Sequence, residues 1–194
     1  MINELRGMRF KGEISFNLYN EPLLDSRLLG FISYARKNLP RSFLYINTNG
    51  DLLDLSMWKK LRQAGLDWAN VTQYDGKINE NILSLLDKLS PDEKKHIHAH
   101  LLDGIHNQGG LVKKSDTRTF PLKKFCKRPF YQMSVNYKGE VLICCVDYFG
   151  WVVVGRLDKE SVPSLWKKKV FRRYRKKLFF KDRSSLKLCN VCDR

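Results

Sequence analysis

The stretch FCKRPFYQMSVNYKGEVLICCVD, residues 125–147, holds three of the five cysteines of this 194-residue chain. Strand-forming residues flank NYKG, which predicts a β-hairpin with its turn at residues 136–139. Such a hairpin brings Cys126 and Cys144 close together. The other two cysteines form the C-x-x-C pair of KLCNVCDR, residues 187–194, and thiolates at that spacing bind one metal or cluster. The sequence therefore predicts that Cys126, Cys144, Cys189 and Cys192 share one site.

The fifth thiol, Cys145, lies next to Cys144 in the sequence. Adjacent side chains of a strand point to opposite faces, so only one of these two thiols is expected to face the site. We predict that Cys144 is the ligand and that Cys145 is a small buried residue. The residue types leave structural zinc and an iron–sulfur cluster both open.

The composition bounds the class of protein. The chain is 43% hydrophobic and 12% aromatic, which is enough for a packed core and argues against disorder. No run of about 18 apolar residues is present, and the first residues lack the layout of a signal peptide. We therefore expect a cytoplasmic protein without a membrane span. In that reducing setting, clustered cysteines hold metal or do redox chemistry more often than they form disulfides.

The net charge of +16 is unevenly distributed. Residues 1–125 carry +5, whereas residues 126–194 carry 17 Lys and Arg against 6 Asp and Glu, or +11. The stretch WKKKVFRRYRKK, residues 166–177, concentrates this charge. Three interpretations stay open: a solvated helix face, which we favour, a surface that binds nucleic acid, and a face that receives an acidic substrate.

The first half of the chain alternates predicted strands with predicted helices. Strands are expected within 13–18, 42–50 and 66–76, and helices within 23–39, 51–65 and 78–90, with Gly65 as a helix stop. This order predicts a parallel sheet covered by helices. In such sheets ligands bind beyond the carboxyl ends of the strands, where YNEP (19–22), NTNG (47–50) and TQYDG (72–76) follow.

After residue 120 the predicted elements are the hairpin, a short strand in 151–157 and one basic amphipathic helix in 161–180. Between these halves, HIHAHLLDGIH places His96, His98 and His100 at alternate positions. A metal site on these imidazoles is one interpretation. We favour a polar strand face or linker, because no carboxylate or cysteine lies at ligand spacing.

The cysteine pattern resembles a known module. Cys126, twelve residues, Gly139, four residues and Cys144, followed by the late C-x-x-C, are similar to the SPASM or shorter twitch module of radical S-adenosylmethionine enzymes. GEISFNLYNEPLLD, YINTNGDLLD and IHNQGG resemble successive segments of the barrel and linker that precede that module. The resemblance implies an α/β fold: an incomplete parallel, TIM-type barrel in residues 1–120, with a linker from about 91, and a small α+β module in 121–194.

The resemblance also implies cofactors and site residues. One auxiliary [4Fe–4S] cluster would be held by the four predicted cysteines. S-adenosyl-L-methionine would contact residues of the three strand-end turns, namely Glu21, Pro22, Asn49, Thr72 and Gln73. The substrate would be a peptide or a small sugar-like or acidic molecule that is oxidised or modified, and an electron-donor protein would be a partner.

One part of the family pattern is missing. The sequence has no C-x-x-x-C-x-x-C motif for the first cluster, so the resemblance implies that an N-terminal segment is absent and that the chain by itself does not generate the radical. The competing interpretation is a non-catalytic iron–sulfur or zinc module whose basic face binds nucleic acid or an acidic partner.

Overall fold

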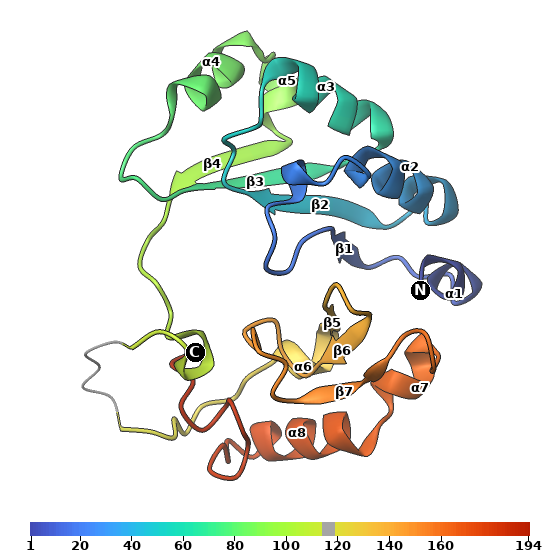
Figure 1. The fold of residues 1–194 in the computed structure, drawn as a ribbon, viewed down its shortest axis with the longest axis vertical. Helices are drawn as coiled ribbons and strands as arrows, with labels where there is room; N and C mark the ends of the chain where they lie inside the picture. Colours follow the sequence, from blue (N-terminus) through green and yellow to red (C-terminus); the bar gives the residue numbers. More distant parts are fainter. Residues whose placement is uncertain (114–118) are drawn as a thin grey trace. The chain divides into compact units, whose positions relative to one another are not determined.

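The computed structural model describes residues 1–113 and 119–194. The chain divides into two compact units, Ile2–Asp103 and Gly104–Arg194, each with its own sheet and helices (Figure 1). The two units are described separately below. The predicted boundary between residues 120 and 121 refers to the family module rather than to compactness, and it stays a prediction.

The first unit is built on a four-stranded parallel sheet in the order β1-β2-β3-β4. The strands are Glu13–Ser15, Phe43–Thr48, Trp68–Gln73 and Ile97–Leu101. The predicted parallel sheet is confirmed, and the histidine-rich stretch supplies its fourth strand. Because consecutive strands pair in parallel, their carboxyl ends meet at one edge of the sheet.

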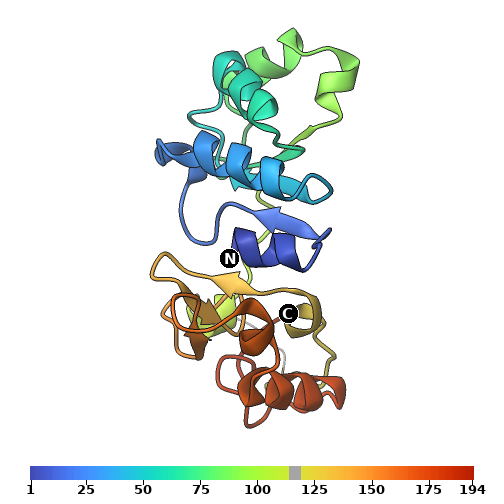
Figure 2. The same ribbon diagram turned by 90° about the vertical axis from the view of Figure 1, so that its right-hand side faces the viewer.

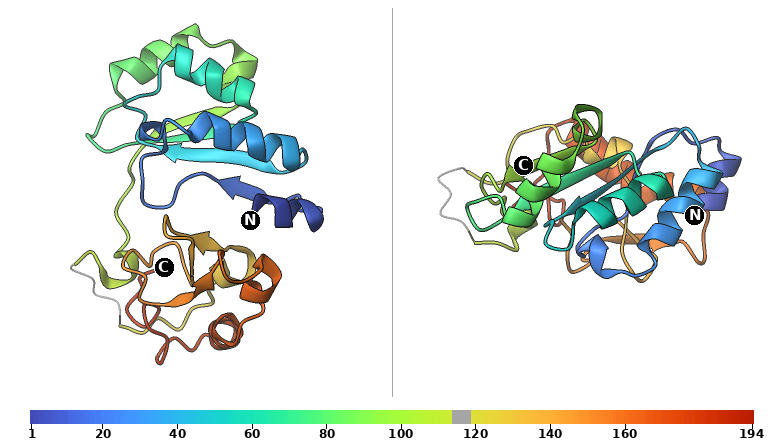
Figure 3. Two further views of the ribbon diagram at one scale, coloured as in Figure 1. Left: turned by 45° about the vertical axis from the view of Figure 1, so that its right-hand side comes forward. Right: turned by 90° about the horizontal axis from the view of Figure 1, so that it is seen from above.

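Helices cover one face of this sheet, as Figures 1 and 3 show. The unit contains α1 (Ile2–Gly7), η1 (Pro22–Leu24), α2 (Leu28–Asn38), α3 (Leu55–Ala64), α4 (Glu80–Lys88) and α5 (Pro91–Lys94). Leu44 and Ile46 are fully buried, whereas the alternate residues Tyr45 and Asn47 are only partly buried. This alternation gives β2 one apolar face and one face with polar character.

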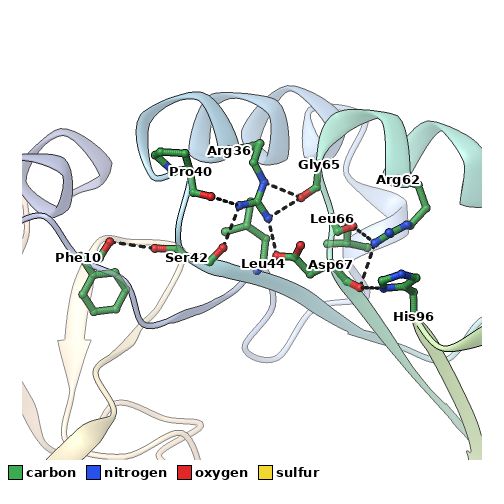
Figure 4. Close-up of polar contacts among 10 residues, drawn as sticks. All are labelled: Phe10, Arg36, Pro40, Ser42, Leu44, Arg62, Gly65, Leu66, Asp67 and His96. Atoms are coloured by element: carbon green, nitrogen blue, oxygen red, sulfur yellow. Dashed lines mark hydrogen bonds and ion pairs between the residues drawn. The ribbon is translucent and has the colours of Figure 1, made fainter.

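The amino ends of β2 and β3 are tied together by charged side chains, shown in Figure 4. The Arg36 guanidinium donates to the carbonyl oxygens of Gly65 and Ser42 and pairs with the Asp67 carboxylate. Asp67 in turn accepts the Leu44 amide N–H at 2.7 Å. Gly65 has φ +102° and ends α3 as predicted, because this left-handed conformation is strained for residues with a Cβ. These contacts fix the end of the sheet opposite to the strand-end turns.

The second unit contains a three-stranded antiparallel sheet in the order β5-β6-β7, with strands Ser134–Val135, Glu140–Leu142 and Val153–Arg156. The predicted hairpin is confirmed as β5–β6. In its turn the Asn136 side chain accepts the N–H groups of Lys138 and Glu140, and Gly139 takes φ +73°. The unit also has η2 (Gln108–Gly110), α6 (Arg128–Tyr131), α7 (Val162–Trp166) and α8 (Lys169–Phe179).

The prediction of one helix across residues 161–180 is wrong, because the chain breaks between α7 and α8. Lys168 leaves the helical conformation at φ −58° and ψ 150°. Its ammonium group donates to the Val154 carbonyl at 3.1 Å and pairs with Glu160 at 2.5 Å. These tertiary contacts anchor the break on β7 and start a second helix, α8, which lies along the outside of the unit (Figures 2 and 3).

The core of the second unit is small and includes the cysteines. Phe171, Tyr174 and Leu178 of α8 pack with residues of the sheet and of the C-terminal turn, and Cys126, Cys144, Cys145 and Cys189 pack against this core.

No helix in residues 1–113 or 119–194 combines the length and the apolar character that a membrane span requires.

Candidate functional site

The four predicted cysteines line one cavity in the second unit. Cys126 lies just before α6, Cys144 just after β6, and Cys189 and Cys192 in the turns that follow α8. The cavity is small, with a volume of about 20 Å³. Its remaining walls are the apolar and basic side chains of Arg128, Pro129, Ile143, Val146, Tyr174, Leu178, Arg183, Leu188 and Arg194. The hairpin and the C-x-x-C pair thus meet, as the sequence predicted, and the ligand role of these thiols stays a prediction.

Contacts outside the thiols hold the C-x-x-C turn in place. Arg183 is buried and donates to the carbonyl oxygens of Lys124, at 3.1 Å, and Arg194, at 2.6 Å. It therefore ties the segment before Cys126 to the end of the C-x-x-C turn. Sequence reasoning missed this residue, because an arginine in a basic stretch gives no sign that it will be buried.

The IHNQGG stretch clamps the same turn. The Asn107 side chain donates to the Val191 carbonyl at 2.5 Å, and the Asn107 amide N–H donates to the Asp193 carboxylate at 2.8 Å. Gly109 has φ +67°, and a Cβ there would approach the Leu188 side chain to 2.5 Å. The close approach of backbone and leucine explains why glycine stands at this position.

Cys144 and Cys145 do not point to opposite faces, so the alternation argument was wrong in its geometry. The Arg128 guanidinium lies 3.2 Å from the Cys145 sulfur and 4.0 Å from the Cys144 sulfur. β6 ends at Leu142, and the chain then turns, with the Asp147 N–H donating to the Cys144 carbonyl. Strand alternation no longer applies inside this turn. Cys145 nevertheless is absent from the cavity lining, which has Cys144.

The surroundings shift the thiol pKa values in opposite directions. A hydrogen bond with the Cys145 thiol, assisted by the nearby Arg128 charge, lowers the pKa of Cys144, and the same pairing raises the pKa of Cys145. Burial, followed by the charges of the neighbouring thiolates, raises the pKa of Cys189 to about 12. Burial likewise raises the pKa of Cys192 to about 11. Several thiolates in this cavity require a cationic group to balance their charge, as a metal or cluster does.

The spacing of the thiols bears on the kind of group they would hold. Within residues 1–113 and 119–194, no three His, Cys, Asp or Glu side chains gather closely enough to share one metal ion. Tetrahedral zinc with Zn–S bonds of 2.3 Å needs sulfur atoms roughly 3.8 Å apart. Thiolates ligate both zinc and iron–sulfur clusters, so the residue types fit either group.

A second cleft lies at the carboxyl ends of the strands in the first unit. It has a volume of about 330 Å³ and is lined by Asn17, Leu18, Tyr19, Asn20, Glu21, Asn47, Thr48, Asn49, Thr72 and Tyr74. Three of the five predicted cofactor contacts, Glu21, Asn49 and Thr72, are in this lining. Pro22 is buried in η1 and Gln73 is buried in β3, and neither is among the lining residues.

Glu21 and Gln73 hold this cleft together through their side chains. The Glu21 carboxylate accepts the Thr48 hydroxyl at 2.6 Å, the Asn49 amide at 2.8 Å and the Leu23 amide at 3.1 Å. The Gln73 amide donates to the Asn49 carbonyl and accepts the Asn79 N–H. Both side chains therefore position the strand-end turns.

A row of polar side chains crosses the sheet beside the cleft. Asn17 accepts from the Asn47 side chain at 3.2 Å, Asn70 donates to Asn47 at 3.2 Å, and His98 lies 3.3 Å from Asn70. Sequence reasoning missed this row. The sequence did contain a sign of it. Asn47 and Asn70 each stand in a strand whose other residues are mostly apolar or β-branched.

Each histidine of the stretch HIHAH, residues 96–100, has a partner of its own. His96 lies 3.0 Å from the Asp67 carbonyl, His98 contacts Asn70, and His100 lies 3.2 Å from the Thr72 hydroxyl. The rings of His98 and His100 stack at 4.9 Å. They belong to a polar strand face, the interpretation that the sequence favoured.

Comparison with known proteins places this arrangement in a family. Residues 126–193 match the SPASM family, described as an iron–sulfur cluster-binding domain. Over its whole length the chain is 27% identical to the S-adenosyl-L-methionine-dependent 2-deoxy-scyllo-inosamine dehydrogenase of Niallia circulans, of which the match covers 77%. Residues 126–193 are therefore a SPASM domain, and over its whole length the chain is similar to an S-adenosyl-L-methionine-dependent dehydrogenase. The predicted resemblance is thereby confirmed.

Solved structures of this SPASM protein's relatives share its fold. The crystal structure of BtrN in complex with AdoMet and 2-DOIA matches with a TM-score of 0.91 and 27% identity, covering all of this chain and 77% of BtrN. A selenomethionine form of BtrN in an open conformation matches with a TM-score of 0.79 and 24% identity, covering all of this chain and 76% of that one.

Proposed function

We propose that this chain binds an auxiliary [4Fe–4S] cluster on Cys126, Cys144, Cys189 and Cys192, as part of an enzyme that oxidises a sugar-like substrate. The observation that carries the proposal is that these four thiols, far apart in sequence, line one cavity in a domain that matches an iron–sulfur family. When bound, such a cluster would supply a one-electron acceptor for the oxidation.

The residues around the thiols have separate roles in this proposal. Arg128 places a cation beside Cys144 and Cys145 and offsets negative charge in the cavity. Tyr174, Leu178 and Leu188 line the cavity and exclude water from it. Arg183 and Asn107 hold the C-x-x-C turn in register with the segment that carries Cys126.

The strand-end cleft is the proposed site for S-adenosyl-L-methionine in the assembled enzyme. Asn49 and Thr72 face it, while Glu21, Pro22 and Gln73 shape the turns around it. The four-stranded sheet would be part of an incomplete TIM-type barrel, whose ligands bind at the carboxyl ends of its strands.

A hydroxylated ring is favoured over a peptide as the substrate. The Niallia circulans relative is a dehydrogenase whose name specifies 2-deoxy-scyllo-inosamine. In this chain the amide groups of Asn17, Asn47 and Asn70 form a continuous polar row beside the cleft. Amide side chains both donate and accept hydrogen bonds, which suits a ring carrying several hydroxyls.

The first test is the iron and acid-labile sulfide content after anaerobic reconstitution. About four iron and four sulfide per chain are expected, lost in Cys144→Ala and retained in Cys145→Ala. If Cys144→Ala kept its iron and Cys145→Ala lost it, Cys145 would replace Cys144 as the assigned ligand. One zinc ion per chain in place of iron would contradict the assignment of an iron–sulfur cluster.

The proposal does not assign radical generation to this chain by itself. The 194 residues contain five cysteines and no C-x-x-x-C-x-x-C motif, so this chain by itself is expected not to cleave S-adenosyl-L-methionine. Incubating the reconstituted chain with the cofactor and a strong reductant checks this expectation. Formation of 5′-deoxyadenosine above the level of a protein-free sample would contradict it.

A further inference from the structure

Helix α8 presents a stripe of four cations to solvent. Lys169, Arg172, Arg173 and Lys176 are all exposed, and their spacing of three and four residues places them on one face of the helix. We refer to these four residues as the basic stripe. The helix lies along the outside of its unit (Figure 2), so the stripe is open to a partner.

Among residues 1–113 and 119–194, none of the four residues takes part in an ion pair, whereas their neighbour Lys177 pairs with Asp182 at 2.7 Å. Arg173 donates a hydrogen bond to the Ser185 carbonyl at 3.3 Å. Like charges three and four residues apart destabilise a helix. A binding surface for an anionic partner accounts for a helix that concentrates such pairs on one face.

Two exposed aromatic residues follow the stripe at the end of the helix. The exposed fractions of Phe179 and Phe180 are 63% and 68%, and their rings meet edge to face at 5.4 Å. Large apolar side chains beside a charged surface are typical of an interface with another protein, in which they supply the desolvated contacts.

The opposite face of α8 lies against the thiol cavity. Tyr174 and Leu178 are buried and line the cavity beside the four cysteines. A helix with its side chains is about 10–12 Å across. A partner on the basic stripe therefore stands roughly one helix diameter from the cavity, and electron transfer through protein is fast only over short distances.

We propose that the basic stripe docks an acidic electron-carrier protein, which exchanges electrons with the auxiliary centre through α8. This inference rests on the proposed function, because it requires a redox centre in the cavity. In the exchange one electron leaves the reduced centre and enters the oxidised carrier, and no covalent bond forms or breaks. The carrier's acidic surface would pair with the stripe, and an apolar part would cover Phe179 and Phe180.

The test is a binding titration of the reconstituted chain with an oxidised bacterial flavodoxin, an acidic flavoprotein, at low and at physiological salt. The variant is Arg172→Glu with Lys176→Glu. Its matched control is Lys59→Glu with Lys60→Glu, which makes the same change in net charge at exposed positions of α3. A 20-nucleotide single-stranded RNA is titrated in parallel.

The variant is expected to weaken flavodoxin binding at least about tenfold, with little effect in the control. Equal weakening in both variants, no binding by the unaltered chain, or RNA binding tighter than flavodoxin binding would each overturn the docking proposal. Iron content is measured on the same samples. If the chain contains its full iron but does not bind flavodoxin, only the docking proposal is refuted. If the chain holds no iron after reconstitution, the proposed function is refuted and the docking proposal with it.

Discussion

The thiol cavity and the strand-end cleft satisfy their polar groups in different ways. In the cleft, the Glu21 carboxylate accepts three hydrogen bonds from protein groups, and the neighbouring asparagines bond to one another. In the cavity, burial raises the pKa values of Cys189 and Cys192, and the charges of neighbouring thiolates add to this effect. The polar groups at the cleft thus stabilise one another, whereas thiolates in the cavity need a cationic group to stabilise them.

The largest expected effect on stability is therefore that of removing iron. Chelation of the reconstituted protein should abolish much of the hydrogen-exchange protection in β5–β7 and α8, because metal-binding free energy becomes folding free energy in a unit with a small core. Protection in β1–β4 should stay unchanged. Mass spectrometry of peptides from both units measures this protection. An equal loss of protection in both units would contradict the prediction that only the second unit depends on the bound group.

A smaller but substantial effect is expected from Glu21→Gln. The amide keeps the size of the side chain but removes the charge that strengthens three hydrogen bonds, so the free energy of unfolding of the first unit should fall by about 2–3 kcal/mol. Urea denaturation measures it, with Asp25→Asn as the exposed control expected to change little. Iron content should not change, and a loss of iron would mean that the two regions are coupled.

Gly65→Ala should destabilise the same unit by about 1–2 kcal/mol, because the left-handed conformation strains a residue with a Cβ. The added Cβ would also approach the Arg36 side chain to 2.6 Å. Thermal unfolding measures the change, and Gly30→Ala is the matched control, since a Cβ at Gly30 meets no atom within 4 Å. Equal destabilisation by both substitutions would show that backbone strain at residue 65 is not the cause.

The smallest effect is expected from Asn70→Ala. Asn70 is only partly buried and bonds to other side chains of the polar row, so its loss should change the free energy of unfolding by less than about 1 kcal/mol. The row would then be available for a ligand rather than required for folding. A loss of several kcal/mol in urea denaturation would instead identify it as part of the structural core.

The sequence by itself determined the main elements and the set of thiols. Periodicity predicted the parallel sheet and its helices, the NYKG turn predicted the hairpin, and cysteine spacing with a family resemblance selected Cys126, Cys144, Cys189 and Cys192. These features could be read because they depend on neighbours in the chain: side-chain alternation, turn residues and ligand spacing are local properties.

Only the tertiary structure decided how side chains distant in sequence meet. It broke the predicted C-terminal helix at Lys168 through contacts with Val154 and Glu160, and it turned Cys145 toward Arg128 beside Cys144. It also buried Arg183 and directed the carboxylate of Glu21 into the turns around the cleft. The physical reason is common to these cases: each conformation is set by hydrogen bonds and charges from other segments, which no local pattern records.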